Sequence, residues 1–217
     1  MISHHHKCIF IHIPKNGGMS IEQSLGANVK ALHKKPWDFK HGTPADLRYA
    51  RLWGEDTYFK FTFLRNPFSR AVSAYFYQLG RCHFRKARGK KVGYYGRRIM
   101  RAYNRAKQEG LPGEGFREFI KARRDDYEEA LRMGRSAWIP QCGYIHGHAY
   151  DFIGCLENIE KDMAYVGKTL GADIKLPHIN KSSHKNWESY YDEDSRLIIS
   201  TMYKEDIDLY KNYNELV

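Results

Sequence analysis

The stretch from Phe10 to Ser20 constrains the fold of this chain more than any other feature. It reads FIHIPKNGGMS, in which an apolar run gives way to a proline, a lysine and two glycines before a helical pattern begins. A strand that ends in a glycine-containing turn and leads into a helix brings free backbone N–H groups and the positive helix end to one point. The stretch therefore predicts an anion site within an α/β fold.

Each residue type in this turn suits a bound phosphate. Gly17 and Gly18 let the backbone approach the anion closely, Lys15 adds a mobile positive charge and Ser20 adds a hydroxyl donor. The turn is not a Walker A loop, because the spacing GxxxxGK[ST] occurs nowhere in the chain. An ordinary strand-to-helix turn is the alternative interpretation.

The composition is that of a globular protein. With 217 residues, of which 42% are hydrophobic, the chain can bury one substantial core, so we expect a single domain over residues 1–217. No run approaches the roughly 18 apolar residues of a membrane span, and the N-terminus lacks the apolar region of a signal peptide. We therefore expect a cytoplasmic protein. Four scattered cysteines without a CxxC pair favour reduced thiols.

The net charge of +11 is concentrated in one segment, a basic insertion at about 81–107. This segment contains eleven basic residues and no acidic one, which leaves 25 basic and 25 acidic residues elsewhere. The eleven are Arg81, Arg85, Lys86, Arg88, Lys90, Lys91, Arg97, Arg98, Arg101, Arg105 and Lys107. The segment could follow a nucleic-acid backbone, steer an anionic substrate or form a solvated surface.

Apolar runs alternate with helical patterns along the chain, as in α/β proteins. Strands are expected at Lys7–Ile13, at Tyr58–Leu64 and in a short run that ends at Gly154, and helices from Pro67, from about 158 to 170 and from about 192 to 203.

Arg65 follows the second strand directly, at the end where open parallel sheets bind their ligands. On the next helix, Ser69, Arg70, Ser73 and Tyr77 are expected on the polar face. Two neighbouring anion sites suit a ligand with two separated phosphates.

Five motifs, in order, resemble those of the carbohydrate-type (family 2) sulfotransferases in their short bacterial form. They are FIHIPKNGGMSIE, FTFLRNPFSRAVSAYFY, DFIGCLENIEKD, LPHINKS and an acidic, tyrosine-containing tail. The resemblance covers nearly the whole chain apart from the basic segment. It implies a P-loop-like three-layer sandwich with a central parallel sheet flanked by helices. It also implies transfer of a sulfuryl group from 3′-phosphoadenosine 5′-phosphosulfate (PAPS) to an acceptor, with release of PAP and no need for a metal.

The resemblance also implies roles for individual residues. The expected contacts to the 5′-phosphosulfate are Lys15, Asn16, Gly17, Gly18, Met19 and Ser20, with Lys15 also catalytic. Arg65 and Ser73 would hold the 3′-phosphate, and Lys181, Ser182 and Ser183 would close over the nucleotide. His41, in HGTPADL, is the candidate base, with His33, Asp38 and Glu55 as alternatives.

Three positions depart from the family pattern. Asn16 and Met19 replace two threonines, and Cys155 stands where an arginine is common. These departures bear on the affinity for the nucleotide more than on the function.

The sequence constrains the identity of the acceptor least. A small-molecule hydroxyl or amine is favoured over a glycan, because the expected location is the cytoplasm. The candidate acceptor-pocket residues are Trp138, Gln141, His148, Tyr94 and Tyr95. A non-catalytic protein that binds RNA or another polyanion would explain the charge but neither phosphate motif, so nucleic acid is not the expected partner. A nucleotide kinase would require the missing Walker A lysine.

Overall fold

The computed structural model describes the chain except for residues 27–43, 45–56, 126, 129–137, 178–185 and 216–217. The chain forms two compact units. The first comprises Met1–Asn66, Pro140–Lys181 and Asp208–Val217, and the second comprises Pro67–Ile139 and Ser182–Ile207. The single domain expected over residues 1–217 stays a prediction.

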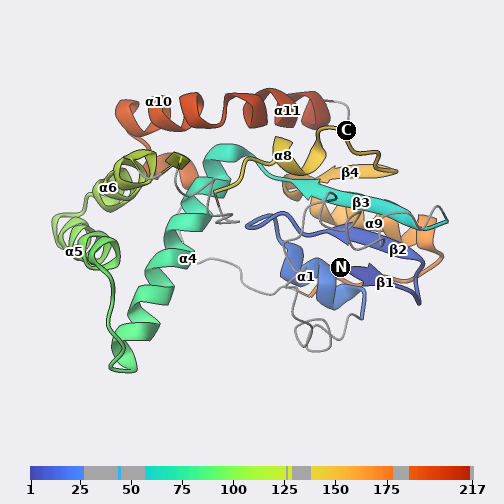
Figure 1. Cartoon of the computed structure of the whole chain (residues 1–217), viewed down its shortest axis with the longest axis horizontal. Coiled ribbons are helices and arrows are strands. Elements are labelled where there is room, and N and C mark those ends of the chain that lie inside the picture. The colour runs from blue at the N-terminus through green and yellow to red at the C-terminus, as the bar shows by residue number, and fades with distance from the viewer. Residues whose placement is uncertain (27–43, 45–56, 126, 129–137, 178–185, 216–217) are drawn as a thin grey trace. The chain divides into compact units, whose positions relative to one another are not determined.

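The first unit is built on a four-stranded sheet, shown in Figure 1. Its strands, in spatial order, are β1 (Ile2–Ser3), β2 (Cys8–Ile11), β3 (Phe59–Leu64) and β4 (Phe152–Cys155). β1 runs antiparallel to β2, whereas β2, β3 and β4 are mutually parallel neighbours. The three expected strands are confirmed, and their carboxyl ends meet at the same edge of the sheet.

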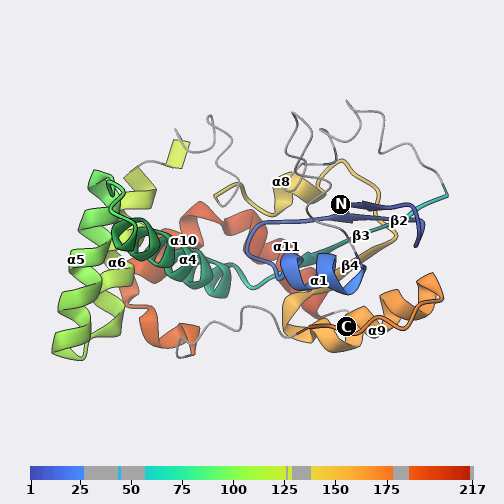
Figure 2. The same ribbon diagram turned by 90° about the horizontal axis from the view of Figure 1, so that it is seen from below.

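Helices α1 (Gly18–Ser24) and α9 (Ile159–Leu170) pack against one face of this sheet, as Figure 2 shows. The Phe10 and Phe61 side chains lie between the sheet and these two helices. Their ring centroids are 5.2 Å apart, and both side chains are almost fully buried. Ile9, whose side chain points to the other face, is buried as well. Burial on both faces explains why β2 reads as a continuous apolar run. The expected α/β fold with a central parallel sheet flanked by helices is confirmed, and β1 adds one antiparallel edge strand to it.

The second unit is helical. It contains α4 (Pro67–Ala87), α5 (Tyr94–Glu109), α6 (Pro112–Asp125), the short η3 (Trp187–Tyr190) and α10 (Glu193–Met202). Residues 204–207 of α11 (Lys204–Glu215) belong to this unit and residues 208–215 to the first. Aromatic rings form much of the core, with Tyr75 and Phe116 at a centroid distance of 5.8 Å. The helices expected from Pro67 and near residues 192–203 are confirmed.

Two residues expected on the polar face of α4 are buried instead. Ser69 is 7% and Arg70 only 4% exposed, whereas Tyr77 is exposed as expected. The Arg70 guanidinium lies 3.8 Å from the buried Asp206 carboxylate and donates a hydrogen bond of 3.0 Å to the Ile139 carbonyl. The prediction was wrong for Ser69 and Arg70, because helical periodicity does not reveal a buried acid supplied by a distant segment.

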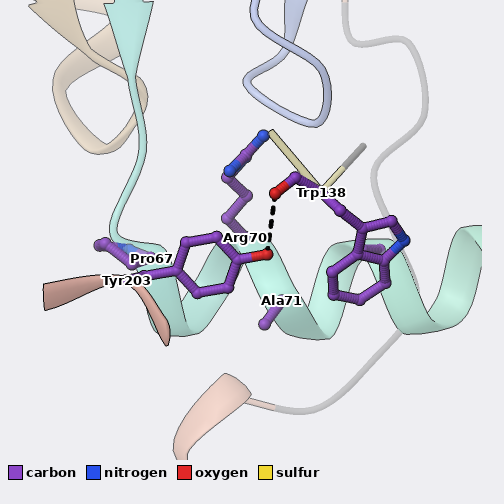
Figure 3. A pocket seen from close by; sticks show the side chains of 6 residues that line it. Pro67, Arg70, Ala71, Trp138 and Tyr203 are labelled. Atoms are coloured by element: carbon purple, nitrogen blue, oxygen red, sulfur yellow. Dashed lines mark hydrogen bonds between the residues drawn. The ribbon is translucent and has the colours of Figure 1, made fainter. Parts of the chain in front are cut away.

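Figure 3 shows the small cavity that Arg70 lines together with Tyr203 and Trp138. The Tyr203 hydroxyl donates to the Trp138 carbonyl at 3.2 Å, which closes one side of the space. The volume is about 10 Å³, close to the minimum for one water molecule. This cavity is therefore a gap in the packing and is too small for a substrate.

Candidate anion-binding site at the sheet edge

The loop between β2 and α1 has the backbone of an anion site. Lys15 has a left-handed φ of 74° and Gly17 a φ of 75°. For a lysine this conformation costs roughly 1–2 kcal/mol, and strain of this kind gathers at functional sites. The backbone N–H groups of Gly17 and Gly18 donate no hydrogen bond to any residue in the described part of the chain. The loop therefore offers unpaired amides beside a lysine, as concave anion-binding loops do.

A buried contact between a histidine and a carboxylate packs beside this loop. His12 Nδ1 lies 2.8 Å from Glu22 Oε1, and both side chains are only 4% exposed. A Cβ atom on Gly18 would come within 2.2 Å of the His12 ring. A Cβ on Gly17 would come within 2.6 Å of Leu156, which follows β4. Close packing against the His12 ring therefore requires glycine at position 18, whereas at position 17 the left-handed φ of 75° favours glycine.

Gln141 connects the loop to the end of β3. It is fully buried and lies just before α8 (Cys142–Ile145). Its Oε1 accepts hydrogen bonds from Asn16 Nδ2 at 2.6 Å and from the Arg65 backbone N–H at 3.0 Å. Its Nε2 donates to the Arg65 carbonyl at 2.9 Å. Gln141 thus fixes both phosphate motifs to each other, and it does not face an acceptor as we expected from the sequence.

Asn16 is directed into the protein. The side chain is 1% exposed, and Nδ2 also donates to the Phe63 carbonyl at 2.7 Å. Its Oδ1 has no hydrogen-bond partner among the described residues. The asparagine that replaces the usual threonine therefore anchors the loop to β3 through its side chain.

Arg65 and Lys15 meet at this edge. Arg65 follows β3, is half-buried, and donates a hydrogen bond of 3.0 Å from its guanidinium to the Lys15 carbonyl. The side chain thereby supports the strained residue of the loop. Parallel neighbouring strands bring the two motifs together, as their positions after β2 and β3 predict.

Cys155, at the end of β4, is a structural residue. It is fully buried, and burial, followed by the nearby Glu157 and Asp162 carboxylates, raises its pKa to about 12. Its backbone N–H donates to Asp162 Oδ2 at 2.7 Å. Burial also raises the pKa of Asp162. The thiol therefore stays protonated at neutral pH and supplies neither a charge nor a nucleophile. All four cysteines are buried, and none forms a disulfide.

The structure brings together only part of the predicted site. Lys15, Asn16, Gly17, Gly18 and Arg65 form one constellation, with Met19 exposed and Ser20 half-buried on α1. Ser73 is half-buried on α4 of the second unit, so its pairing with Arg65 stays a prediction. Seven predicted residues lie outside the described part of the chain: His33, Asp38, His41, Glu55, Lys181, Ser182 and Ser183.

The other candidate acceptor residues are distributed over both units. Trp138 is buried in the core of the second unit, and Tyr94 and Tyr95 are exposed at the start of α5. His148 is half-buried in the first unit, shortly after α8. The sequence did not reveal His12, Glu22 or the positioning role of Gln141. The available signal for the His12–Glu22 contact was one histidine in an apolar run, followed ten residues later by a glutamate.

A mostly parallel sheet whose strand ends carry an amide-rich basic loop and a supporting arginine is an α/β arrangement suited to an anionic ligand at the sheet edge. The model of the sulfotransferase family matches residues 1–214, and the chain belongs to this family. The predicted resemblance to carbohydrate-type sulfotransferases is confirmed.

Three curated relatives illustrate the similarity. Carbohydrate sulfotransferase 14 of Danio rerio is 28% identical over 86% of this chain and 51% of its own length. Carbohydrate sulfotransferase 11 of Rattus norvegicus is 33% identical over 58% of this chain and 37% of its own. Carbohydrate sulfotransferase 9 of Homo sapiens is 26% identical over 84% of this chain and 43% of its own. The chain thus spans about half the length of these relatives or less. No solved structure matches it.

No helix in the described ranges is both long enough and apolar enough to cross a membrane.

Proposed function

We propose that this chain is a sulfotransferase that transfers the sulfuryl group of PAPS to a hydroxyl group of a glycan. The observation that carries the proposal is the junction of Lys15 and Arg65, joined by a 3.0 Å hydrogen bond where two parallel strands end. The unpaired amides of Gly17 and Gly18 beside these two cations fit a phosphosulfate. When bound, PAPS supplies the activated sulfuryl group.

The residues of the loop have a clear electrostatic task in this reaction. The acceptor oxygen forms a bond to sulfur while the bond between sulfur and the phosphate oxygen breaks, so negative charge develops on the leaving phosphate. Lys15 and the amides of Gly17 and Gly18 stabilise that charge as preorganised donors. Because Arg65 and Gln141 fix the loop before the ligand arrives, little reorganisation is needed during the reaction.

The acceptor proton must pass to a base with a pKa near the working pH. We propose His41 for this role, on the resemblance of HGTPADL to the corresponding family segment. Ser73, Lys181, Ser182 and Ser183 complete the proposed nucleotide site, with Ser73 and Arg65 at the 3′-phosphate.

A glycan acceptor is now favoured over the small-molecule acceptor expected from the sequence. The support comes from the relatives, which are named as carbohydrate sulfotransferases. A small-molecule hydroxyl or amine remains the second candidate. A protein that only binds polyanions would account for the basic segment but would have no use for the strained Lys15 loop.

The first experiment is a calorimetric titration with PAP, AMP and ADP without added metal, followed by turnover of PAPS with glycan and small-molecule acceptors. We expect micromolar PAP binding that far exceeds binding of the other two nucleotides. Lys15→Ala should lower turnover more than PAP affinity, and Arg65→Ala should weaken PAP binding. Arg124→Ala, which removes an exposed arginine of the second unit, is the control. Equal, small effects of Lys15→Ala and Arg65→Ala would refute the assignment.

A further inference from the structure

A histidine interrupts the apolar run that contains β2. The neighbouring residues Cys8–Ile11 and Ile13 are apolar and almost fully buried, and His12 between them is buried as well. A buried polar side chain needs a partner, and His12 finds it on α1, where Glu22 Oε1 lies 2.8 Å from Nδ1. Apolar side chains of similar size can often replace a buried pair of this kind without loss of stability. Stability alone therefore does not explain why the chain has this pair.

The His12–Glu22 pair joins the two ends of the loop over residues 13–17. His12 follows β2 directly, and Glu22 lies on α1, which begins directly after the loop (Figure 1). Side chains on a helix tilt toward its N-terminus, which directs the Glu22 carboxylate back toward the end of β2. The hydrogen bond therefore connects the strand and the helix that the loop separates.

The His12 ring also forms part of the packing beneath the loop. A Cβ atom on Gly18 would collide with Cδ2, Nε2 and Cγ of the ring, so the ring lies directly against the Gly18 backbone. The ring stacks on Phe10 of the core, with centroids 5.9 Å apart and an interplanar angle of 27°. The Gly18 amide, which donates to no described residue, therefore rests on a ring whose orientation the bond to Glu22 controls.

The loop needs such support on the side of α1. Its left-handed Lys15 is strained, and strain of this kind persists only where the surrounding structure holds it. Arg65 and Gln141 hold the loop on the side of β3. No side chain caps the start of α1 through a hydrogen bond. The contact that links the loop's end to α1 is the one between His12 and Glu22.

We propose that His12 and Glu22 are positioning residues of the anion-binding loop: Glu22 orients the His12 ring, and the ring holds the Gly18 backbone so that the loop amides face the anion before it binds. Their role in sulfuryl transfer rests on the proposed function. Because an ionised carboxylate can only accept a hydrogen bond, Nδ1 carries the hydrogen. Both side chains act through the Gly18 backbone and not on the reacting atoms.

The charge of Glu22 offers a competing explanation. Burial lowers the pKa of the Met1 ammonium group to about 6, and the nearby Glu22 carboxylate acts in the opposite direction. If Glu22 served only to balance this cation, its charge would matter and its hydrogen bond to His12 would not. Glu22→Gln separates the two explanations, because glutamine keeps an oxygen acceptor for Nδ1–H but carries no charge.

The test compares four variants with the wild type. Glu22→Gln keeps the acceptor, whereas Glu22→Met removes it at nearly constant size. The double variant His12→Leu with Glu22→Met replaces the whole pair by apolar side chains, so no buried polar group of the pair is left without a partner and the protein should fold. Gln23→Met is the matched control, because it makes a similar change at an exposed position of the same helix.

The order of the loop is measured first, without ligand, as hydrogen exchange of a peptide that covers residues 13–24. This peptide contains the bonds from the Asn16 N–H to the Ile13 carbonyl and from the Ser20 N–H to the Gly17 carbonyl. We expect these amides to exchange at least about fivefold faster in Glu22→Met and in the double variant. Glu22→Gln and Gln23→Met should exchange like the wild type.

Binding of PAP is measured by calorimetry and stability by urea denaturation. The Kd for PAP should rise about tenfold in Glu22→Met and in the double variant, and should stay within about threefold of the wild type in Glu22→Gln and Gln23→Met. The double variant should be as stable as the wild type. In turnover assays with PAPS, kcat should fall in the same two variants, because the loop amides stabilise the leaving phosphate.

Two results would overturn the positioning role. One is wild-type exchange and wild-type PAP affinity in the stable double variant, which would show that the pair only fills space. The other is a loss in Glu22→Gln as large as in Glu22→Met, which would assign the effect to the charge of Glu22. Failure of the wild type to bind PAP would instead reject the proposed function, while the exchange measurement would still decide whether the pair holds the loop.

Discussion

Replacing Gln141 by leucine would test whether the two phosphate motifs depend on one buried side chain. The change removes three hydrogen bonds, to Asn16 Nδ2, the Arg65 N–H and the Arg65 carbonyl. Asn16 keeps its bond to the Phe63 carbonyl, so the two Arg65 backbone groups suffer most. A buried polar group without a partner costs about 1–3 kcal/mol, so Gln141→Leu should lower the free energy of unfolding by roughly 2–4 kcal/mol after partial relaxation.

The same substitution should weaken the binding of PAP. In the variant, PAP must restore the loop geometry when it binds. If this takes roughly 1.4–2.7 kcal/mol of binding free energy, the Kd for PAP rises about 10-fold to 100-fold. Urea denaturation gives the stability and calorimetry gives the Kd. Tyr144→Phe, at a fully buried position of α8, is the control and should leave the Kd unchanged. A large loss of stability in Gln141→Leu with wild-type PAP affinity would refute the positioning role.

Two further predictions concern a glycine and a carboxyl group. Gly18→Ala should abolish PAP binding and cost several kcal/mol, about 3 or more, because the new Cβ meets the buried His12 ring at 2.2 Å. Gly80→Ala in α4 adds a Cβ that meets no other group within 4 Å, so this variant should be more stable than the wild type by about 1 kcal/mol. Thermal melts in which Gly80→Ala is less stable than Gly18→Ala would contradict the packing argument. Burial acts to raise the pKa of Asp192 at the start of α10, but hydrogen bonds from Ser195 and a nearby arginine outweigh it and hold the pKa below 3.8. Its stabilising contribution is therefore present at neutral pH and lost as the pH falls below about 4; Asp192→Asn should lose less stability than the wild type between pH 7 and pH 3 in urea titrations, and equal losses would contradict this.

Much of the fold could be predicted because the relevant signals are local. The apolar run before Pro14 gave β2, the aromatic run before Arg65 gave β3, and Pro67 marked the first residue of α4. Gly171 ends α9 in the left-handed conformation that its position predicts. Helices α5, α6, α8 and α11 and the edge strand β1 were not predicted. The high charge of α5 obscured its apolar stripe, and α8 and β1 are too short for periodicity to show.

The sequence by itself determined that a glycine-containing basic loop and an arginine each follow a buried strand, and that the chain belongs to the sulfotransferase family. These are properties of neighbouring residues, so the order of side chains along the chain is enough to express them. Only the tertiary structure decided which buried polar groups meet. Gln141 lies 125 residues from Asn16 and 76 from Arg65, and yet its amide joins both. A buried polar group needs a partner, but which partner it finds depends on the segments that folding brings together.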